Sequence, residues 1–360
     1  MIFLVIALAA FLTYVEARSL MDHSASLRYE QSFSKNLVAP DETFEIITGL
    51  TNLGAGFFAF LRLAEELPAA ITVQATSAKI ERRGSSDKVH VYTTYLLPHS
   101  RLERRLKVSL PTRGRYVFLG AEIGFGDFLG LNEHKVKENR FGEVVVYPAE
   151  AAISYVLDCL GGFIGDLSVR RFIIEDPVLT VGFRDYTGRE PLKAISWLQS
   201  AKAGRMMVKN YDYTTEPVAL VLLNIETVVP EGEREALIEG CYSIAHSVCR
   251  LLEERGIPYS LVTNAMTAGA FLPWTDSGEG LGQRHFLAIL EGLGRASYRY
   301  SEKFGALWDR AVLRDDSAGI VLITPDERDV EAIDQAPGRR ERQMVVVAAQ
   351  SLIGSKEAAP

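Results

Sequence analysis

The sequence predicts a multidomain protein in which a hydrophobic N-terminal helix is followed by an antiparallel β-sandwich and then by a mainly parallel α/β sheet. Between Leu27 and Val146, short runs of alternating apolar and polar residues are separated by turn residues, which is typical of antiparallel strands. From Val218 the pattern changes to apolar strands that alternate with amphipathic helices, which predicts βαβ units and a parallel sheet. The length of 360 residues also exceeds one average domain of about 150 residues.

The charge of the chain argues against nucleic acid as a partner. The formal net charge is -7, whereas binding to backbone phosphates needs a clustered excess of Lys and Arg. Short basic runs occur at Arg82–Arg83, Arg101–Lys107 and Arg339–Arg340, each close to acidic residues. We interpret these runs as solvated surface.

The three cysteines, Cys159, Cys241 and Cys249, show no spacing typical of a metal site. Cys241 and Cys249 fall on the apolar stripe of a predicted helix, where free cysteine behaves as a small buried hydrophobe. A reducing compartment is the simplest inference.

The N-terminal run Ile2–Val15 is almost continuously apolar. As a helix it would span about 21 Å against a hydrocarbon core of about 30 Å, which is short for a membrane crossing. A signal peptide cleaved near Val15–Ala17 is the rival interpretation, although no Lys or Arg precedes the apolar run. The residues alone leave both interpretations open.

The predicted sandwich covers residues 25–148. Its candidate strands are Ser26–Phe33, Thr43–Asn52, Ala70–Lys79, His90–Tyr95, Glu103–Ser109, Gly114–Ile123 and Glu143–Tyr147. The run Phe57–Phe60 fits core packing, with an exposed docking patch as the alternative. The glycines between Gly124 and Gly130 lack the spacing and the strand-turn-helix context of a dinucleotide loop, so we reject that function.

A linker is predicted at 149–216, with a short helix that ends at Gly161–Gly162. Its second half, Phe183–Asp212, combines many charges with Tyr186, Trp197 and Tyr211. In the favoured interpretation an internal ion-pair network pins this connector, and Trp197 fills a pocket between the charges. The network would contain Asp185, Arg189, Glu190, Lys193 and Lys202. In the alternative, Arg189, Lys193 and Trp197 face outward as a binding hot spot.

The α/β domain is predicted at 217–350 and a disordered tail at 351–360. The predicted strands are Val218–Leu223, Tyr259–Thr263, Gly319–Ile323 and Met344–Ala349. The predicted helices are Glu233–Arg255, Gln283–Ala296, Glu302–Val312 and Glu327–Ala336. Gly256 and Pro258 stand where a helix cap and a helix stop belong.

The carboxyl ends of the predicted parallel strands are where such sheets bind ligands. They carry Asn224, Glu226, Asn264 and Asp326. The six histidines show no metal-binding pair, and neither a nucleophile elbow nor a phosphate-binding loop occurs. His246 lies off the apolar stripe of its helix, so we expect it to be solvated or to cap a helix. The sequence therefore predicts a protein that is not an enzyme.

The connector resembles the signature segment of the domain of unknown function 58 family. The matching residues are Arg184, Asp185, Tyr186, Leu192, Lys193, Ile195, Trp197, Ser200, Ala201, Lys202, Gly204 and Val208. The preceding domain carries further matches in the family's order, at Asn52, Leu67–Pro68, Arg113–Tyr116, Asp127–Leu131 and Val146–Pro148. The chain departs from the commoner pattern at Arg189–Pro191, where Gly-Asp-Asp would stand, and at Ser196 and Leu198, so any role of those acids is in doubt.

The resemblance implies that the α/β domain is von Willebrand factor A-like, with a metal-ion-dependent adhesion site at the end of its first strand. That site needs an Asp-x-Ser-x-Ser pattern, but this sequence has Asn224, Glu226 and Val228 there. The substitutions remove a charge and an oxygen that a hard cation needs. No metal is therefore expected, although Glu226 and Asp326 leave weak Mg²⁺ binding open.

The resemblance also favours a membrane anchor at 1–20, because members of the family carry hydrophobic helices before the soluble part. It implies a protein at the cell membrane, with its soluble part in the cytoplasm and a MoxR-type AAA+ ATPase as partner. We therefore expect a non-enzymatic adaptor or scaffold in protein or complex maturation. The residues expected to carry partner binding are Arg184, Asp185, Tyr186, Arg189, Lys193, Trp197 and Lys202. The alternative is a metal-dependent cell-surface adhesion or ligand-binding module.

Overall fold

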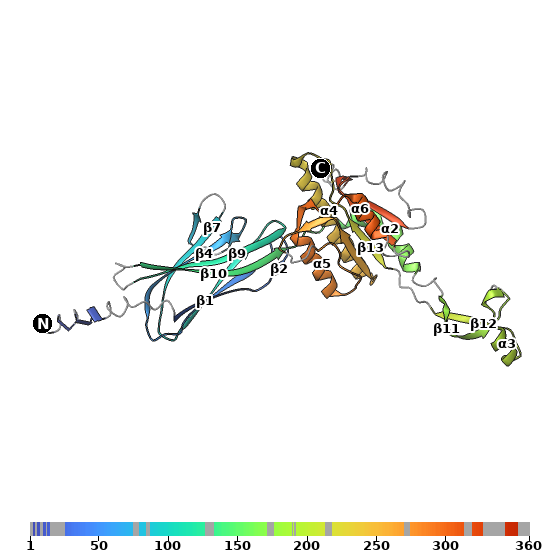
Figure 1. Ribbon diagram of the computed structural model, residues 1–360, viewed down its shortest axis with the longest axis horizontal. Helices are drawn as coiled ribbons and strands as arrows, with labels where there is room; N and C mark the ends of the chain where they lie inside the picture. The colour runs from blue at the N-terminus through green and yellow to red at the C-terminus, as the bar shows by residue number, and fades with distance from the viewer. Residues whose placement is uncertain are drawn as a thin grey trace. The chain divides into compact units, whose positions relative to one another are not determined.

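The chain divides into two compact units, Met1–Ala149 and Glu150–Pro360. The computed structural model describes residues 3, 6, 7, 10, 11, 13, 14, 26–74, 79–83, 87–126, 133–170, 176–188, 190, 192–212, 218–269, 274–312, 319–326 and 343–351. In Figure 1 the first unit runs from blue to green and the second from green to red.

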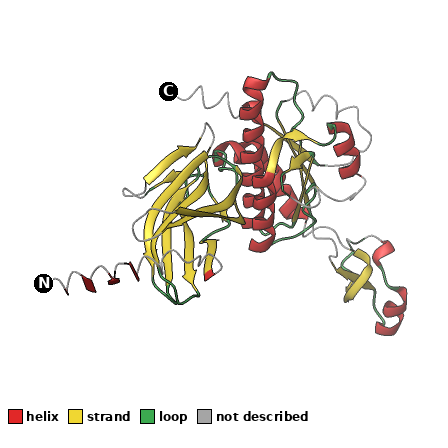
Figure 2. Cartoon of the chain, turned by 60° about the vertical axis from the view of Figure 1, so that its left-hand side comes forward, coloured by secondary structure: helices red, strands yellow, loops and turns green. Residues whose placement is uncertain are grey.

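The first unit is built from strands, which Figure 2 draws in yellow. They are β1 (Leu27–Phe33), β2 (Leu37–Val38), β3 (Phe44–Asn52), β4 (Phe58–Pro68), β5 (Thr72–Val73), β6 (Lys79–Arg83), β7 (Asp87–Leu96), β8 (Arg101–Ser109), β9 (Gly114–Gly126) and β10 (Glu133–Val146). They form a four-stranded sheet of order β1-β3-β8-β5 and a six-stranded sheet of order β2-β10-β9-β4-β7-β6. The pairings are antiparallel except that of β2 with β10, so the expected antiparallel sandwich is present.

Two apolar clusters lie between these sheets. Phe44 and Ile46 of β3 pack in one cluster with Phe118 of β9, while Leu50 of β3 packs in the other with Leu63 of β4. Period-2 alternation explains this arrangement, because every second residue of β3 faces the other sheet. Thr48 occupies the inward position between the two clusters, so a polar residue separates them.

Two strand predictions for this unit need correction, and one packing prediction holds only in part. β4 was missed, although it is central in its sheet, because Glu65 interrupts its apolar alternation. The predicted strand Ala70–Lys79 is instead β5 in one sheet and β6 in the other. In Phe57–Phe60, Phe58 is buried as core, whereas Phe60 is 37 % exposed.

The second unit combines strands with helices, red in Figure 2. Its elements are α2 (Ile153–Arg170), β11 (Asp176–Asp185), η2 (Leu192–Ala194), α3 (Trp197–Ala203), β12 (Met207–Asp212), β13 (Ala219–Leu223), α4 (Glu231–Glu254), β14 (Tyr259–Thr263), β15 (Ala265–Thr267), α5 (Gln283–Arg295), β16 (Ala296–Tyr300), α6 (Phe304–Val312), β17 (Gly319–Thr324) and β18 (Met344–Ala348). The main sheet has the order β14-β13-β17-β18, and all its pairings are parallel.

Helices cover both faces of this parallel sheet. Residues Val221 and Val321 pack with α2, α4 and α5, whereas Leu222 and Leu322 pack with α6 through Leu307 and Trp308. Both faces of the strands are therefore buried, which explains why Ala219–Leu223 is continuously apolar.

The segment predicted as a linker contains structure that belongs to this core. The predicted short helix does not end at Gly161–Gly162, because α2 runs on to Arg170. Val156, Leu160 and Phe163 of α2 are buried in the cluster formed with α4.

β16, which pairs with β15, was not predicted. The predicted helix Glu327–Ala336 lies outside the described residues, as do 352–360 of the predicted tail.

Within the described residues, no helix is both long and apolar enough to cross a membrane. Most of residues 1–25 are outside them. The membrane anchor thus stays a prediction.

Candidate functional site

The carboxyl ends of β13 and β14 are joined by the side chain of Asn264. Its Nδ2 donates to Asn224 Oδ1 at 2.7 Å and to the Glu302 carbonyl at 3.2 Å. Its Oδ1 accepts from the Ile225 amide at 3.0 Å. The side chains of Asn224 and Asn264 are both fully buried, so they cannot hydrogen-bond to water. The hydrogen bonds within the protein satisfy their polar atoms instead.

The side chains of Asn224 and Glu226, two predicted metal-ligand positions, both accept hydrogen bonds from backbone amides. Asn224 Oδ1 also accepts from the Glu226 amide at 3.0 Å, and Asn224 Nδ2 donates to Thr324 Oγ1 at 3.4 Å. Glu226 Oε2 accepts from the Phe304 amide at 2.7 Å, at the first residue of α6. A carboxylate there satisfies one of the unpaired N–H groups of the helix end and suits its positive dipole.

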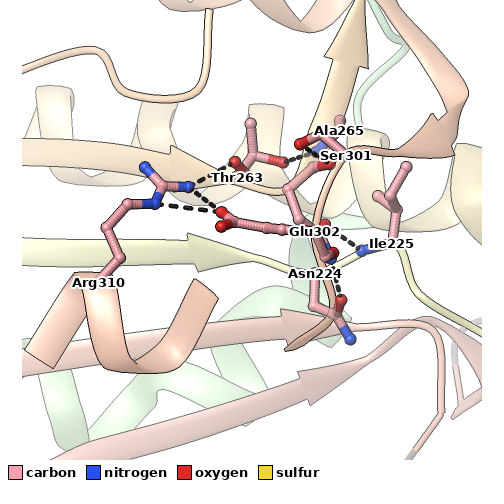
Figure 3. Close-up of polar contacts among 8 residues, drawn as sticks. Asn224, Ile225, Thr263, Ala265, Ser301, Glu302 and Arg310 are labelled. Atoms are coloured by element: carbon pink, nitrogen blue, oxygen red, sulfur yellow. Dashed lines mark hydrogen bonds and ion pairs between the residues drawn. The ribbon is translucent and has the colours of Figure 1, made fainter. Parts of the chain in front are cut away.

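A second arm of the network ties α6 to the end of β14. Arg310 donates to the Thr263 carbonyl at 3.1 Å and to Glu302 Oε1 through both Nε and Nη2 (Figure 3). The Ala265 amide donates to Thr263 Oγ1 at 3.0 Å. Ser301 donates to the Asn264 carbonyl through its amide at 2.8 Å. The loops at this edge are therefore cross-linked by hydrogen bonds.

The chemistry of these groups does not suit a hard cation. The lead position is the neutral amide Asn224, and one carboxylate oxygen of Glu226 already accepts the helix amide. Asp326 is buried, 7 % exposed, and also makes polar interactions. In the part of the chain that the structure describes, no group of three or more His, Cys, Asp or Glu side chains could hold a metal.

The segment Phe183–Asp212 forms a hairpin, which we call the signature hairpin. β11 and β12 pair antiparallel, with Arg184 opposite Val208 and Asp185 opposite Met207. The connection between them contains η2 and α3, and α3 ends at Gly204 with φ 66°. Ser200 Oγ accepts from the Met207 amide at 2.8 Å and so fastens α3 to β12.

The ion pairs of the signature hairpin differ from the predicted network. Arg184 pairs with Glu190, and Asp185 pairs with Arg205 at 3.1 Å. Lys193 and Lys202 are exposed and form no ion pair with a described residue. Arg189 lies outside the described residues. Of the predicted network, Asp185 and Glu190 therefore do form ion pairs, but with Arg205 and Arg184, and the predicted pairing with Lys193 and Lys202 is wrong.

Glu190 organises the loop that follows β11. Its Oε2 accepts from the Thr187 amide at 3.0 Å and its Oε1 from Thr187 Oγ1 at 2.9 Å. Partial burial raises the pKa of Glu190, but the hydrogen bonds from Arg184 and Thr187 outweigh this and hold the pKa at about 2. Tyr186 joins the β12 side through its amide, which donates to the Met206 carbonyl at 2.9 Å.

Trp197 does not fill a pocket, as the favoured interpretation expected. It is the first residue of α3 and its side chain is 65 % exposed. The small interior of the signature hairpin is made instead by Ala194, Ile195 and Val208. The position of Trp197 agrees with the alternative, an outward-facing side chain.

Sequence reasoning missed a buried Glu–His pair in the sandwich. Glu65 Oε2 lies 3.1 Å from His90 Nδ1, and both side chains are at most 2 % exposed. Glu65 Oε1 accepts from Thr48 Oγ1 and from Tyr29 Oη at 3.4 Å. Burial, and then the Glu65 charge, raise the pKa of Tyr29. The sequence signal for this pair was Glu65, which stands at a position of β4 where the alternation would place an apolar residue.

His246 is also buried rather than solvated. It is 3 % exposed on α4, its ring centroid lies 5.8 Å from that of Phe286, and its Nε2 lies 4.0 Å from Glu150. The prediction of a solvated or capping histidine is wrong, because α2 and α5 cover more of α4 than the apolar stripe suggested.

Comparison with family models gives no match, and neither does comparison with curated proteins. Among solved structures, a cohesin module from a Clostridium perfringens family 33 glycoside hydrolase is 16% identical over 34% of this chain and 96% of that chain, with a TM-score of 0.25. The CARDB domain of a Pyrococcus furiosus protein is 15% identical over 33% and 91%, with a TM-score of 0.22. A type II cohesin domain from Acetivibrio cellulolyticus is 8% identical over 33% and 95%, with a TM-score of 0.26. At these TM-scores we draw nothing about function from the likenesses.

Proposed function

We propose that the protein is a non-enzymatic scaffold that binds a partner protein through the signature hairpin. The observation that carries the proposal is the exposure of large apolar side chains on this one short segment. They are Phe183 at 42 %, Leu192 at 68 %, Trp197 at 65 %, Leu198 at 68 % and Met206 at 45 %. Grouped apolar exposure of this kind is typical of protein-binding surfaces, and Trp is enriched at their hot spots.

The strand-end network supports a scaffold over a catalyst. At the edge where parallel sheets usually bind ligands, Asn224, Asn264 and Glu226 hold the loops and the first turn of α6 together. Side chains committed to fixing backbone make this edge rigid. A rigid α/β unit is a suitable platform for a docking segment.

The partner class follows from the sequence resemblance. Members of the domain of unknown function 58 family are thought to act with MoxR-type AAA+ ATPases, and the matching residues Arg184, Lys193, Trp197 and Lys202 lie on the signature hairpin. We propose such an ATPase as the partner, with the protein held at the cytoplasmic side of the membrane by residues 1–20. The proposed role is adaptor work in protein or complex maturation.

The test compares two equally exposed aromatic side chains. Trp197→Ala is the test variant, and Tyr95→Ala, with Tyr95 66 % exposed in the sandwich, is the matched control. Loss of a hot-spot Trp costs 2 kcal/mol or more, so we expect about 30-fold or weaker binding of Trp197→Ala to the purified ATPase, measured by titration calorimetry. Tyr95→Ala should bind like the parent protein. No measurable affinity of the parent protein, or equal affinity of both variants, would contradict the proposal.

A metal-dependent ligand-binding module is the second candidate, because Glu226 and Asp326 place two carboxylates at the strand ends. A cation that binds only the folded state raises stability by RT ln(1 + [L]/Kd), so thermal shift with Mg²⁺ or Mn²⁺ detects even millimolar affinity. Under the scaffold proposal we expect no shift. A shift that is lost in Glu226→Gln, which keeps an acceptor for the Phe304 amide, would favour the module instead.

A further inference from the structure

A pocket of about 320 Å³ lies at the edge of the sandwich and is rich in arginine. Arg28 belongs to β1, Arg101 is the first residue of β8, and Arg140 belongs to β10 of the other sheet. Glu30 is the carboxylate among the lining residues, so the lining has a formal excess of two positive charges. The volume is at the small end for ligand sites, which span about 300–1,000 Å³.

Glu30 orients two of the three guanidinium groups. Its Oε1 lies 2.9 Å from Arg28 Nε and its Oε2 lies 3.5 Å from Arg101 Nη2. Each of these groups has five N–H donors, so one carboxylate leaves most of them available. Among the described residues, no carboxylate pairs with Arg140.

Glycine makes room for Arg101 on the floor of the pocket. Gly49 of β3 pairs with Glu30 of β1 and with Glu103 of β8, so it lies in the middle of the sheet. A Cβ at Gly49 would come 3.3 Å from Arg101 Nη2. The Arg101 guanidinium therefore lies directly over the β3 backbone and next to the Glu30 carboxylate.

Gln31 forms the inner side of the pocket. Gln31 also lines the pocket, and both its Oε1 and its Nε2 are shielded from solvent and have no hydrogen-bond partner among the described residues. Side-chain alternation puts Gln31 on the opposite face of β1 from Arg28 and Glu30, and β1 is the end strand of its sheet. The pocket thus extends round the edge of β1 toward the space between the sheets.

We propose that this pocket binds a small oxyanion, the carboxylate or phosphate group of a ligand, between the guanidinium groups of Arg101 and Arg140. Guanidinium groups match carboxylate and phosphate oxygens with paired, charge-assisted hydrogen bonds. This site lies in the sandwich and is independent of the signature hairpin and of its partner.

The test is a titration of the full chain followed by amide NMR at low ionic strength, with inorganic phosphate in one arm and acetate in the other. Arg101→Gln and Arg140→Gln are the test variants. Arg105→Gln is the matched control, because Arg105 also faces outward from β8, is 61 % exposed and pairs with Glu103, but does not line the pocket. We expect saturable shifts of the Gln31 side-chain amide and of Gly49, with binding at least about tenfold weaker in each test variant and unchanged in the control.

The phosphate and acetate arms distinguish the two possible ligand groups. Saturation in the phosphate arm alone assigns a phosphate ligand, saturation in the acetate arm alone assigns a carboxylate, and both support the site. Absence of saturable shifts in both arms overturns the proposal. Equal weakening by Arg105→Gln would also overturn it, because only general surface charge would then be at work.

Discussion

The Glu65 carboxylate is placed where the sandwich would otherwise be apolar. It lies between the clusters around Phe44 and Leu50, and it joins Thr48 and Tyr29 of one sheet to His90 of its own sheet. Burying a carboxylate beside a histidine brings little net stability, but removing one partner leaves the other buried and unpaired. The cluster therefore makes the relative position of the two sheets specific.

We predict that Glu65→Ala lowers the free energy of unfolding by about 3–5 kcal/mol, because His90, Thr48 and Tyr29 lose their shared acceptor. The measurement is urea denaturation. The control is Glu66→Ala, the adjacent residue on the other face, whose contact with Lys137 at 3.7 Å is a surface ion pair worth about 0–1 kcal/mol. Similar losses in the two variants would show that Glu65 has no special role.

The cysteines differ in their access to solvent. Cys241 and Cys249 are fully buried, whereas Cys159 is half-buried. Burial raises the pKa of both Cys249 and Cys159, which lowers the fraction of reactive thiolate. We predict that a thiol reagent labels only Cys159 in the native protein, slowly, and labels all three cysteines in urea. Rapid labelling of Cys249, identified by mass spectrometry, would contradict this burial.

At the scale of elements, the strand-end network holds β13, β14 and α6 in place. We predict that Asn264→Ala destabilises the second unit, because the buried Ile225 amide loses its acceptor, and a buried unpaired group costs about 1–3 kcal/mol. Asn224 Oδ1 loses one of its two donors and keeps the Glu226 amide. Thermal unfolding measures the loss. Asn139→Ala, at an exposed position of β10 in the other unit, serves as a control that leaves this network intact. Equal stability of Asn264→Ala and the parent protein would mean that the network contributes nothing.

The signature hairpin should lose local order in acid. Its Glu190 has a folded-state pKa of about 2, below the ordinary value of 4.5, so its stabilising effect is complete above pH 4.5 and is lost as the pH falls toward 2. We predict that the NMR signal of the Thr187 amide, which donates to Glu190, shifts through this window. In Glu190→Gln the transition should be absent. A midpoint near pH 4.5 would show that Arg184 and Thr187 do not favour the carboxylate.

At the scale of the whole molecule, the two units have separate cores. The clusters of the sandwich contain residues from 1–149 alone, and those of the α/β unit contain residues from 150–360 alone. Each unit therefore has the apolar burial it needs to fold by itself.

We predict two unfolding transitions in calorimetry, with Glu65→Ala lowering one Tm and Asn264→Ala the other. The double variant should show both shifts, additive within about 0.5 kcal/mol, because the sites share no partner. A single transition lowered by either variant would mean that the units unfold as one.

Periodicity in the sequence was sufficient to predict both kinds of sheet. Apolar and polar residues alternate over Phe44–Asn52 because one face of this strand is buried. Ala219–Leu223 is continuously apolar because both faces of this strand are buried. In both cases the pattern lies within the strand's own sequence. The same reasoning failed for β4 and α2. Glu65 interrupts the apolar alternation of β4 because it pairs with His90 on β7. α2 continues through its glycines because its packing on α4 outweighs their low helix propensity.

The candidate sites depended more on tertiary structure. The sequence alone determined that Asn224, Glu226 and Asn264 stand at strand ends, since strand order along the chain sets that. Only the folded structure decided that they hydrogen-bond to one another and to α6, that Trp197 faces solvent, and that Arg28, Arg101 and Arg140 share a pocket. Such pairings join strands far apart in sequence, and they are set by sheet register and packing, which no local pattern contains.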